Sequence, residues 1–295
     1  MSTRSSQVFI DEGLQFPEGL RWHRGELWFS DFYRRQVISA DASGKLTVRA
    51  YVGGQPSGLG FRPDGTPLVA SVYDRNVLAL TPEKPDHPLT LAGSPGKVVI
   101  GPTNDMAVDR AGRAYVTGFG YEAMYEPFDE KHTTRIAMVD VDGSVSLQGH
   151  ALHMPNGIAF SPDGRLLIVS ETTRNRLTAF DVAPAGTLSN GRLFADLGKL
   201  SPDGLAVDAE GAVWVACWHD GVLLRVRDGG EICENIRVTT QGHWVPACAL
   251  GGPDGKTLYY SLADTDITRS KRGESKAVIM QMRVDVPAPA EGAHA

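Results

Sequence analysis

Short apolar segments alternate with polar turns along most of the chain, and this pattern recurs six times. Each copy starts with proline or threonine, continues with a polar or small residue, often glycine, and then has an apolar segment, a turn and a second apolar segment. The copies are PEGLRWHRGELWFSD from Pro17, PSGLGFRPDGTPLVAS from Pro56, TNDMAVDRAGRAYVTG from Thr103, PNGIAFSPDGRLLIVS from Pro155, PDGLAVDAEGAVWVAC from Pro202 and PACALGGPDGKTLYYS from Pro246.

The turn and strand chemistry predicts small antiparallel sheets. The turns inside five copies place glycine where a hairpin needs positive φ: 62–65, 109–112, 161–164, 208–211 and 253–255. The apolar segments are rich in Val, Leu, Ile, Trp and Tyr, which favour half-buried strands. A third apolar segment follows in several copies, such as QVISAD at 36–41, and no long amphipathic helix pattern occurs.

The regular spacing predicts the fold class. The copies start about 40 to 55 residues apart, a typical blade-sized period. A small sheet of this kind cannot bury both faces alone, but radial packing of several sheets buries them. We therefore predict an all-β, six-bladed β-propeller that occupies residues 1–295 as a single domain, with a loose tail from about residue 286. A β-sandwich is the alternative, but sandwiches lack such even repetition.

Composition narrows the class of partner and the compartment. The net charge is −6, whereas a nucleic-acid binder normally carries a basic face. No run of 18 apolar residues is present and the first residues lack the apolar core of a signal peptide, so we expect no membrane partner. The three cysteines, Cys217, Cys233 and Cys248, have no metal-type spacing and are expected to be reduced. These features predict a cytoplasmic protein whose partner is a small-molecule substrate.

Six positions are predicted to converge on the axis of the propeller. The first strand of each blade lines the central channel, so the residue at its start points to the axis at the same end in every blade. Aligning the copies gives Glu18, Ser57, Asn104, Asn156, Asp203 and Ala247.

This set predicts a metal site. Two carboxylates, Glu18 and Asp203, would meet two amides, Asn104 and Asn156, in one channel mouth. Burying like charges together is costly, and a divalent cation removes that cost. Carboxylate and amide oxygens are ligands that suit Ca²⁺, Mg²⁺, Mn²⁺ or Zn²⁺. The alternative is that Asn and Asp only cap turns at strand starts.

At these residues the chain resembles the senescence-marker-protein (regucalcin), gluconolactonase and luciferin-regenerating-enzyme family. The matching motifs occur in order from about residue 16 to 280: PEGLRW with LWFSD, TNDMAVDRAGRAYV, PNGIAFSPDGRLL, SETTRNRLTAFDV, PDGLAVDAEGAVWVA and GGPDGKTLYY. The resemblance implies a six-bladed propeller with one divalent metal ion, Ca²⁺ being favoured over Zn²⁺, Mn²⁺, Mg²⁺ or Fe²⁺. It further implies hydrolysis of sugar lactones, an activity of many members.

The resemblance also implies residue roles. Glu18, Asn156 and Asp203 match the metal ligands, and Asn104 matches an asparagine beside the metal that contacts substrate or a metal-bound water. The chain departs from regucalcin-type members at Pro102, where they carry an arginine that helps to hold a sugar acid. Together with Met106 and the aromatic residues Phe119, Tyr121, Trp218 and Trp244, this predicts a more apolar mouth and a substrate less polar than gluconolactone.

The expected reaction is hydrolysis of a lactone by metal-activated water, with Asp203 as proton acceptor and Asn104 as a donor to the developing oxyanion. Two alternatives remain: a broader esterase or phosphotriesterase, and a non-catalytic propeller that binds calcium or another ligand. Ser57 lies in PSGLG, which is not a nucleophile elbow, and is expected to line the pocket. His153, His219 and His243 are expected at the rim in structural roles. Glu171 is expected to be a surface acid or a neighbour of the metal ligands.

Overall fold

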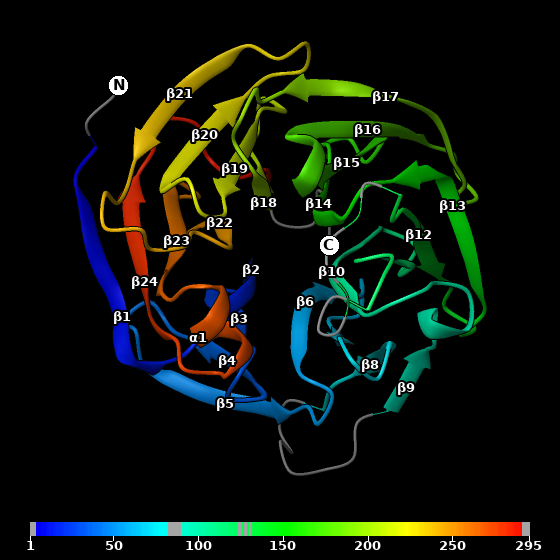
Figure 1. Ribbon diagram of the computed structural model, residues 1–295, viewed down its shortest axis with the longest axis horizontal. Coiled ribbons are helices and arrows are strands. Elements are labelled where there is room, and N and C mark those ends of the chain that lie inside the picture. The colour runs from blue at the N-terminus through cyan, green and yellow to red at the C-terminus, as the bar shows by residue number, and fades with distance from the viewer. Residues whose placement is uncertain (1–3, 82–89, 123–125, 127–128, 130, 291–295) are drawn as a thin grey trace.

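The computed structural model describes residues 4–81, 90–122, 126, 129 and 131–290, and nearly all of its regular structure is β-strand. Six four-stranded antiparallel sheets surround a central axis, as Figure 1 shows face-on. The predicted six-bladed propeller is confirmed. The blades contain four strands each, one more than the sequence pattern had indicated.

The first three blades follow the chain from the axis outward. The first contains β2 (Pro17–His23), β3 (Glu26–Asp31), β4 (Gln36–Ala40) and β5 (Leu46–Tyr51). The second contains β6 (Pro56–Phe61), β7 (Pro67–Ser71), β8 (Asn76–Ala79) and β9 (Thr90–Gly93), followed by the 3₁₀ turn η1 (Pro95–Lys97). The third contains β10 (Thr103–Val108), β11 (Ala114–Gly118), β12 (Thr134–Val139) and β13 (Val145–Leu152).

The last three blades complete the circle. The fourth contains β14 (Pro155–Phe160), β15 (Leu166–Glu171), the 3₁₀ turn η2 (Thr172–Arg174), β16 (Arg176–Val182) and β17 (Leu188–Asp196). The fifth contains β18 (Pro202–Val207), β19 (Val213–Cys217), β20 (Val222–Val226) and β21 (Ile232–Arg237). The sixth contains β22 (Cys248–Gly251), β23 (Thr257–Asp264), the helix α1 (Ile267–Lys271), β24 (Lys276–Arg283) and, from the other end of the chain, β1 (Ser6–Leu14).

The N-terminal strand closes the ring. β1 pairs antiparallel with β24 and forms the outer edge of the sixth blade (Figure 1). This pairing joins residues that are more than 260 positions apart, for example Ser6 and Met282. The chain then continues from β1 in the sixth blade directly into β2 of the first, so the two blades are joined covalently as well as by side-chain packing.

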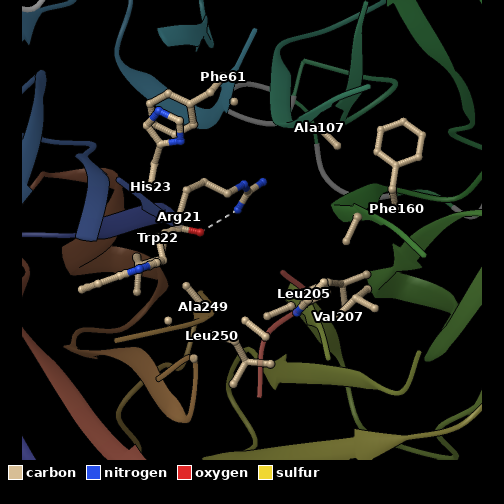
Figure 2. Close-up of a pocket in the computed structure, with 18 of the residues that line it drawn as sticks. Arg21, Trp22, His23, Phe61, Ala107, Phe160, Leu205, Val207, Ala249 and Leu250 are labelled. Carbon is tan, nitrogen blue, oxygen red and sulfur yellow. Dashed lines mark hydrogen bonds between the residues drawn. The ribbon is translucent and has the colours of Figure 1, made fainter. Parts of the chain in front are cut away.

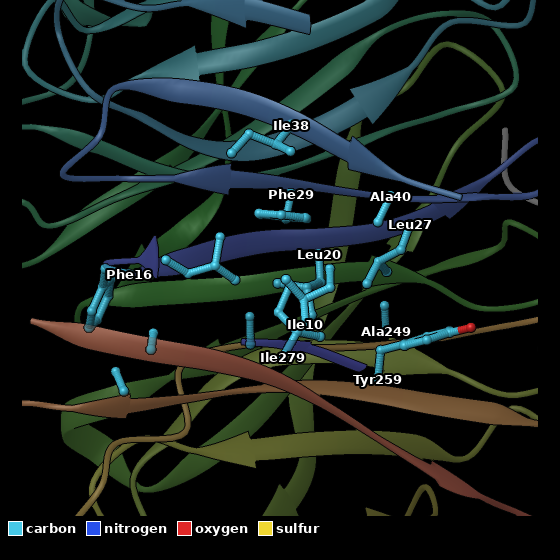
Figure 3. Close-up of a cluster of buried hydrophobic side chains, with 14 of the residues drawn as sticks. Ile10, Phe16, Leu20, Leu27, Phe29, Ile38, Ala40, Ala249, Tyr259 and Ile279 are labelled. Carbon is cyan, nitrogen blue, oxygen red and sulfur yellow. The ribbon is translucent and has the colours of Figure 1, made fainter. Parts of the chain in front are cut away.

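Each interface between neighbouring blades has its own hydrophobic cluster in the described part of the chain. The cluster between the first and sixth blades includes Ile10, Leu20, Phe29, Tyr259 and Ile279 (Figure 3). Apolar residues on both faces of a blade explain why its inner strands contain long buried runs rather than strict alternation. These clusters hold the six innermost strands in fixed positions around the channel.

The segment after β24 returns toward the channel. The Ala288 N–H donates to the Gly255 carbonyl oxygen at 2.8 Å, and the Pro287 carbonyl oxygen accepts from the Ala209 N–H at 2.9 Å. The segment from about residue 286 was expected as a loose tail; up to Ala290 it lies against the fifth and sixth blades, and residues 291–295 lie outside the described part.

Candidate metal centre and active site

The innermost strands bring the predicted site residues to one end of the channel. Glu18, Ser57, Asn104, Asn156 and Asp203 are each the second residue of β2, β6, β10, β14 and β18. Ala247 immediately precedes β22. Since the strands run in the same direction along the axis, equal positions within them lie at the same height.

A β-bulge follows the site residue in five of these strands. The register shifts between Glu18 and Arg21, and at the corresponding places in β6, β10, β14 and β18. A bulge re-aims side chains locally and is common next to active sites. In this protein the bulge allows the residue before it to point to the axis, while later residues of the strand line the cavity or pack in the core.

Glycine after the site residue lets the innermost strands approach one another closely. A Cβ at Gly157 would lie 2.1 Å from the Asp203 carbonyl oxygen, and one at Gly19 would lie 2.4 Å from the Ser57 carbonyl oxygen. Gly58 and Gly204 occupy the same position in their strands. The crowding explains why the repeat has glycine there and why the four polar side chains come so near to one another.

The two amides and Ser57 form a hydrogen-bonded chain next to the Asp203 carboxylate. Asn104 Nδ2 donates to Asn156 Oδ1 at 2.7 Å. The Asn156 side chain also lies near the Asp203 carboxylate and lowers its pKa, against the larger raising effects of burial and Glu18. Ser57 Oγ makes a longer hydrogen bond of 3.4 Å to Asn104 Oδ1. Each side chain is oriented by its neighbour, so the arrangement is fixed before any ligand binds.

The site concentrates negative charge in a region that excludes most water. Asp203 is 4% exposed, and its Oδ1 atom is buried without a hydrogen-bond partner. Burial and the nearby Glu18 carboxylate raise the pKa of Asp203 well above its usual value. Burial and then the Asp105 charge raise the pKa of Glu18 to about 8, although Glu18 keeps partial solvent exposure. An orphaned carboxylate oxygen beside a second acid is the environment that a cation stabilises.

A third acid and a base in the channel were missed by the sequence analysis. Asp105 stands where four other innermost strands have glycine, and its Oδ1 accepts from Arg21 Nη2 at 2.8 Å. Arg21 reaches from the first blade to the third and also donates to the Met106 carbonyl oxygen at 2.7 Å. Arg21 neutralises Asp105, so the charge left uncompensated in the channel is that of Glu18 and Asp203. The break in the glycine pattern of the repeat was the signal that could have revealed this pair.

A cavity of about 420 Å³ occupies the opposite end of the channel. It is lined by the later residues of the innermost strands and by residues 288–290. Figure 2 shows Arg21, Trp22, His23 and Phe61 on one side of it and Phe160, Leu205 and Val207 on another. Its lining is mainly apolar, whereas the carboxylates and amides converge at the other end. The chemistry of the donor groups, rather than the size of the cavity, therefore identifies the candidate metal centre.

The other predicted candidates take structural positions. The His153 N–H donates to Glu171 Oε2 at 2.9 Å, His219 packs on Trp218, and His243 Nδ1 lies 3.3 Å from Thr239 Oγ1. The interpretation of Glu171 as a surface acid is wrong. Its side chain is fully buried and accepts hydrogen bonds from Arg176 at 2.7 Å and Thr178 at 2.6 Å, which lower its pKa despite the opposing effect of burial.

Only some of the apolar residues that were predicted to line the mouth of the channel lie there. Met106 does not reach it, because the bulge in β10 turns this fully buried side chain into the cluster between the second and third blades. Tyr121 stacks on His132 with ring centroids 4.6 Å apart. Trp218 and Trp244 pack edge to face, with their ring centroids 4.8 Å apart. Phe119 and Tyr121 follow β11 at this same end, with ring centroids 6.4 Å apart. Met106 is therefore the member of the predicted set that does not reach the mouth.

The described residues offer few alternatives to the candidate centre for binding a metal ion. In the described ranges, no group of three or more His, Cys, Asp and Glu side chains is arranged to hold a metal ion. A metal at the candidate centre therefore depends on the amide oxygens as well as on Glu18 and Asp203. None of the helices described is long and apolar enough to cross a membrane.

Comparison with known proteins decides the family. A family model described as the SMP-30/gluconolactonase/LRE-like region matches residues 16–264, which includes every candidate site residue. The chain belongs to this family. The match confirms the resemblance inferred from the motifs.

Individual members of the family are distant relatives. The chain is 28% identical to the 6-deoxy-6-sulfogluconolactonase of Pseudomonas putida over 200 residues, which is 64% of each protein and so less than two thirds of that relative. A luciferin-regenerating enzyme has the same fold, with a TM-score of 0.81, 18% identity and 97% of each chain covered. Regucalcin from Agrobacterium tumefaciens, described as a calcium-binding protein, has a TM-score of 0.77 at 23% identity, with 99% of this chain and 98% of that chain covered.

Proposed function

We propose that this protein is a divalent-metal-dependent lactonase, with Glu18, Asn156 and Asp203 as metal ligands and Asn104 beside the ion. The observation that carries the proposal is the buried, unpartnered Oδ1 of Asp203 next to the Glu18 carboxylate and two amides. Such a donor set fits a hard divalent cation, and Ca²⁺ in particular accepts carboxylates, amide carbonyls and waters in flexible geometry. The calcium-binding description of the A. tumefaciens regucalcin supports the same ion.

When bound, a divalent cation supplies Lewis-acid polarisation of the ester carbonyl and makes water more acidic. The residues of the chain provide the remaining functions. Asp203 accepts the proton of the attacking water, because its Oδ1 atom has no other hydrogen-bond partner. The water oxygen bonds to the carbonyl carbon, the ring C–O bond breaks, and the proton passes to the leaving oxygen, so that the product is a hydroxy acid.

Asn104 and Asn156 position the reacting groups. Asn104 Nδ2 uses one of its two hydrogens on Asn156 Oδ1, which leaves the second for the carbonyl oxygen of a substrate. The Asn156 side chain lies near the Asp203 carboxylate and favours its ionised form. Hydrogen-bond donors fixed in this manner stabilise the negative charge that develops on the carbonyl oxygen in the transition state. No nucleophilic side chain is required, and Ser57 donates only to Asn104.

A panel of small lactones, tested with and without a chelator, examines the proposal. We expect turnover of at least one lactone, its loss on chelation, and its recovery when Ca²⁺, Mn²⁺, Zn²⁺ or Mg²⁺ is added separately. Carboxylic esters and phosphotriesters in the same panel test the broader hydrolase. Metal binding without turnover of any compound would favour a non-catalytic ion-binding propeller, and turnover that persists without metal would overturn the metal dependence.

A further inference from the structure

The rim of the candidate active site carries a continuous row of aromatic side chains, which we call the aromatic arc. Its members come from the second, first, sixth and fifth blades: Tyr73, Phe32, Tyr33, Phe16, Trp244 and Trp218. All lie at the same end as Glu18 and Asp203. Phe16 directly precedes β2, Phe32 directly follows β3, and Trp218 directly follows β19.

The rings of the aromatic arc touch in sequence around the rim. Ring centroids are 6.3 Å apart for Tyr73 and Phe32, and 6.4 Å apart for Phe32 and Phe16. They are 6.2 Å apart for Phe16 and Trp244, and 4.8 Å apart for Trp244 and Trp218. Most of these pairs meet edge to face, a favourable geometry for aromatic rings. The arc is thus one packed surface rather than a set of isolated side chains.

Part of the aromatic arc is exposed at the rim, whereas its other members belong to or pack against the hydrophobic cluster between the first and sixth blades. Phe16 and Trp244 are buried and form its base, whereas Phe32, Tyr33 and Trp218 are half-buried and Tyr73 is 38% exposed. Tyr33 lies close enough to Glu18 for the carboxylate charge to add to the effect of burial in raising the Tyr33 pKa. An apolar group held on the arc would therefore be next to the reacting carbonyl of the same molecule.

Backbone and side-chain contacts hold the aromatic arc in place. The Tyr33 hydroxyl lies 2.6 Å from Ser270 Oγ of α1, which sits beside the turn between β3 and β4 (Figure 1). The Val245 N–H donates to the Trp218 carbonyl oxygen at 2.6 Å, and the Trp244 N–H donates to that of Ala263 at 2.9 Å. Fixed rings lose little conformational entropy when a ligand binds, which favours affinity.

The fourth blade gives the rim a different character. Its residues at this end include His153 and the exposed Arg174, whose Nη2 lies 3.4 Å from His153 Nε2. The rim therefore has an extended aromatic side and a polar side. A sugar lactone can place only its C–H faces on aromatic rings and would desolvate hydroxyl groups at its edge there, whereas an aryl group carries no polar atoms and avoids that cost.

We infer that the substrate of this site is a cyclic ester with an aryl or similar planar apolar substituent, which stacks on the aromatic arc while the ester lies at the metal centre. This inference rests on the proposed lactonase function and specifies its substrate class. The exposed part of the arc, Tyr73 with Phe32, contacts the outer edge of the substituent, so these two residues set the preference without contacting the ester.

The test compares two lactams, which cannot be hydrolysed as lactones are: 5-phenyl-2-pyrrolidinone and unsubstituted 2-pyrrolidinone. Their binding to the metal-loaded protein is measured by calorimetry. We expect the phenyl compound to bind at least about tenfold more tightly, equivalent to about 1.4 kcal/mol. Tyr73→Ala and Phe32→Ala should each reduce this ratio severalfold. Tyr51→Ala is the control, because Tyr51 is 52% exposed on the outer strand β5, and it should leave the ratio unchanged.

Tyr73→Ala is the decisive variant, because its partly exposed side chain can be removed with little effect on folding, as a thermal melt will check. Equal binding of the two lactams, or an unchanged ratio in Tyr73→Ala, would overturn the inference. The corresponding lactones, γ-phenyl-γ-butyrolactone and γ-butyrolactone, are assayed in parallel. If neither is hydrolysed but the phenyl lactam binds at the arc, the proposed function fails while the ligand class stands. If both are hydrolysed with equal kcat/KM, the inference fails while the lactonase stands.

Discussion

Asp203→Ala is expected to lower kcat/KM for lactone hydrolysis by about 10³-fold or more, the range associated with losing a general base, and to weaken metal binding at the same time. Both effects have one cause, because the Asp203 carboxylate is assigned as metal ligand and as proton acceptor. Its buried Oδ1 has no other partner that would compete for either role. Steady-state kinetics together with metal titration of the same preparation measure the two losses.

Ser57→Ala is the matched control. Ser57 is also buried and also the second residue of an innermost strand, but its hydroxyl only donates a 3.4 Å hydrogen bond to Asn104. It should keep most of the activity and the metal. An Asp203→Ala protein that still binds metal and turns over lactone would remove Asp203 from the mechanism. An inactive, folded Ser57→Ala protein would point to serine nucleophile chemistry.

The stability of the metal-free protein is expected to fall as pH rises from about 4.5 to about 8. Glu18 has its ordinary pKa of 4.5 in the unfolded chain and a pKa raised to about 8 in the folded protein. Between these values the folded state binds more protons than the unfolded state, so the free energy of unfolding decreases with pH. The contribution of protonated Glu18 to the free energy of unfolding is therefore fully present below pH 4.5 and is lost above about pH 8. The raised pKa of Asp203 likewise makes the free energy of unfolding decrease as the pH rises.

The size of this loss is expected to be on the order of 3 kcal/mol, because one pKa unit corresponds to about 1.4 kcal/mol and partial exposure of Glu18 reduces the full effect. Urea unfolding in the presence of a chelator, at several pH values, measures it. Glu18→Gln should make the profile less steep, because an amide does not titrate and only Asp203 then contributes to the slope. Added metal should stabilise the protein more at pH 8 than at pH 5, since it binds the ionised carboxylates. A chelated wild-type profile identical to that of Glu18→Gln would contradict this account.

The architecture was predictable because the repeat period and the hairpin glycines act within each blade. The fourth strand of each blade was harder to predict, because outer strands face solvent and lose their apolar pattern. In β17 (Leu188–Asp196), for example, five consecutive residues are exposed. The pairing of β1 with β24 leaves no local signal at all, because the two strands lie at opposite ends of the chain.

The positions of the candidate ligands followed from their place in the repeat, but the directions of later side chains did not. Met106 lies two residues after Asn104, so simple alternation would aim both at the axis. The bulge between Thr103 and Met106 shifts the register, and a shift of one residue exchanges the two faces of a strand. Met106 consequently packs in the core.

The Arg21–Asp105 pair and the aromatic arc depend on contacts between blades. Arg21 and Asp105 are 84 positions apart and meet across the channel. Members of the arc follow or precede strands in four different blades, where aromatic residues in sequence are as compatible with strand packing as with a binding surface. Only the arrangement of the blades around the axis shows that these rings form one surface beside Glu18.

The most direct test of the metal centre is a crystal structure of the protein soaked with Mn²⁺, in which anomalous scattering locates the ion. The account predicts one ion on the channel axis, with oxygen atoms of Glu18, Asn156 and Asp203 within about 2.6 Å of it and Asn104 close by. An ion at the opposite end of the channel near Arg21, an ion elsewhere on the molecule, or an axial site that stays empty at saturating Mn²⁺ would contradict the account.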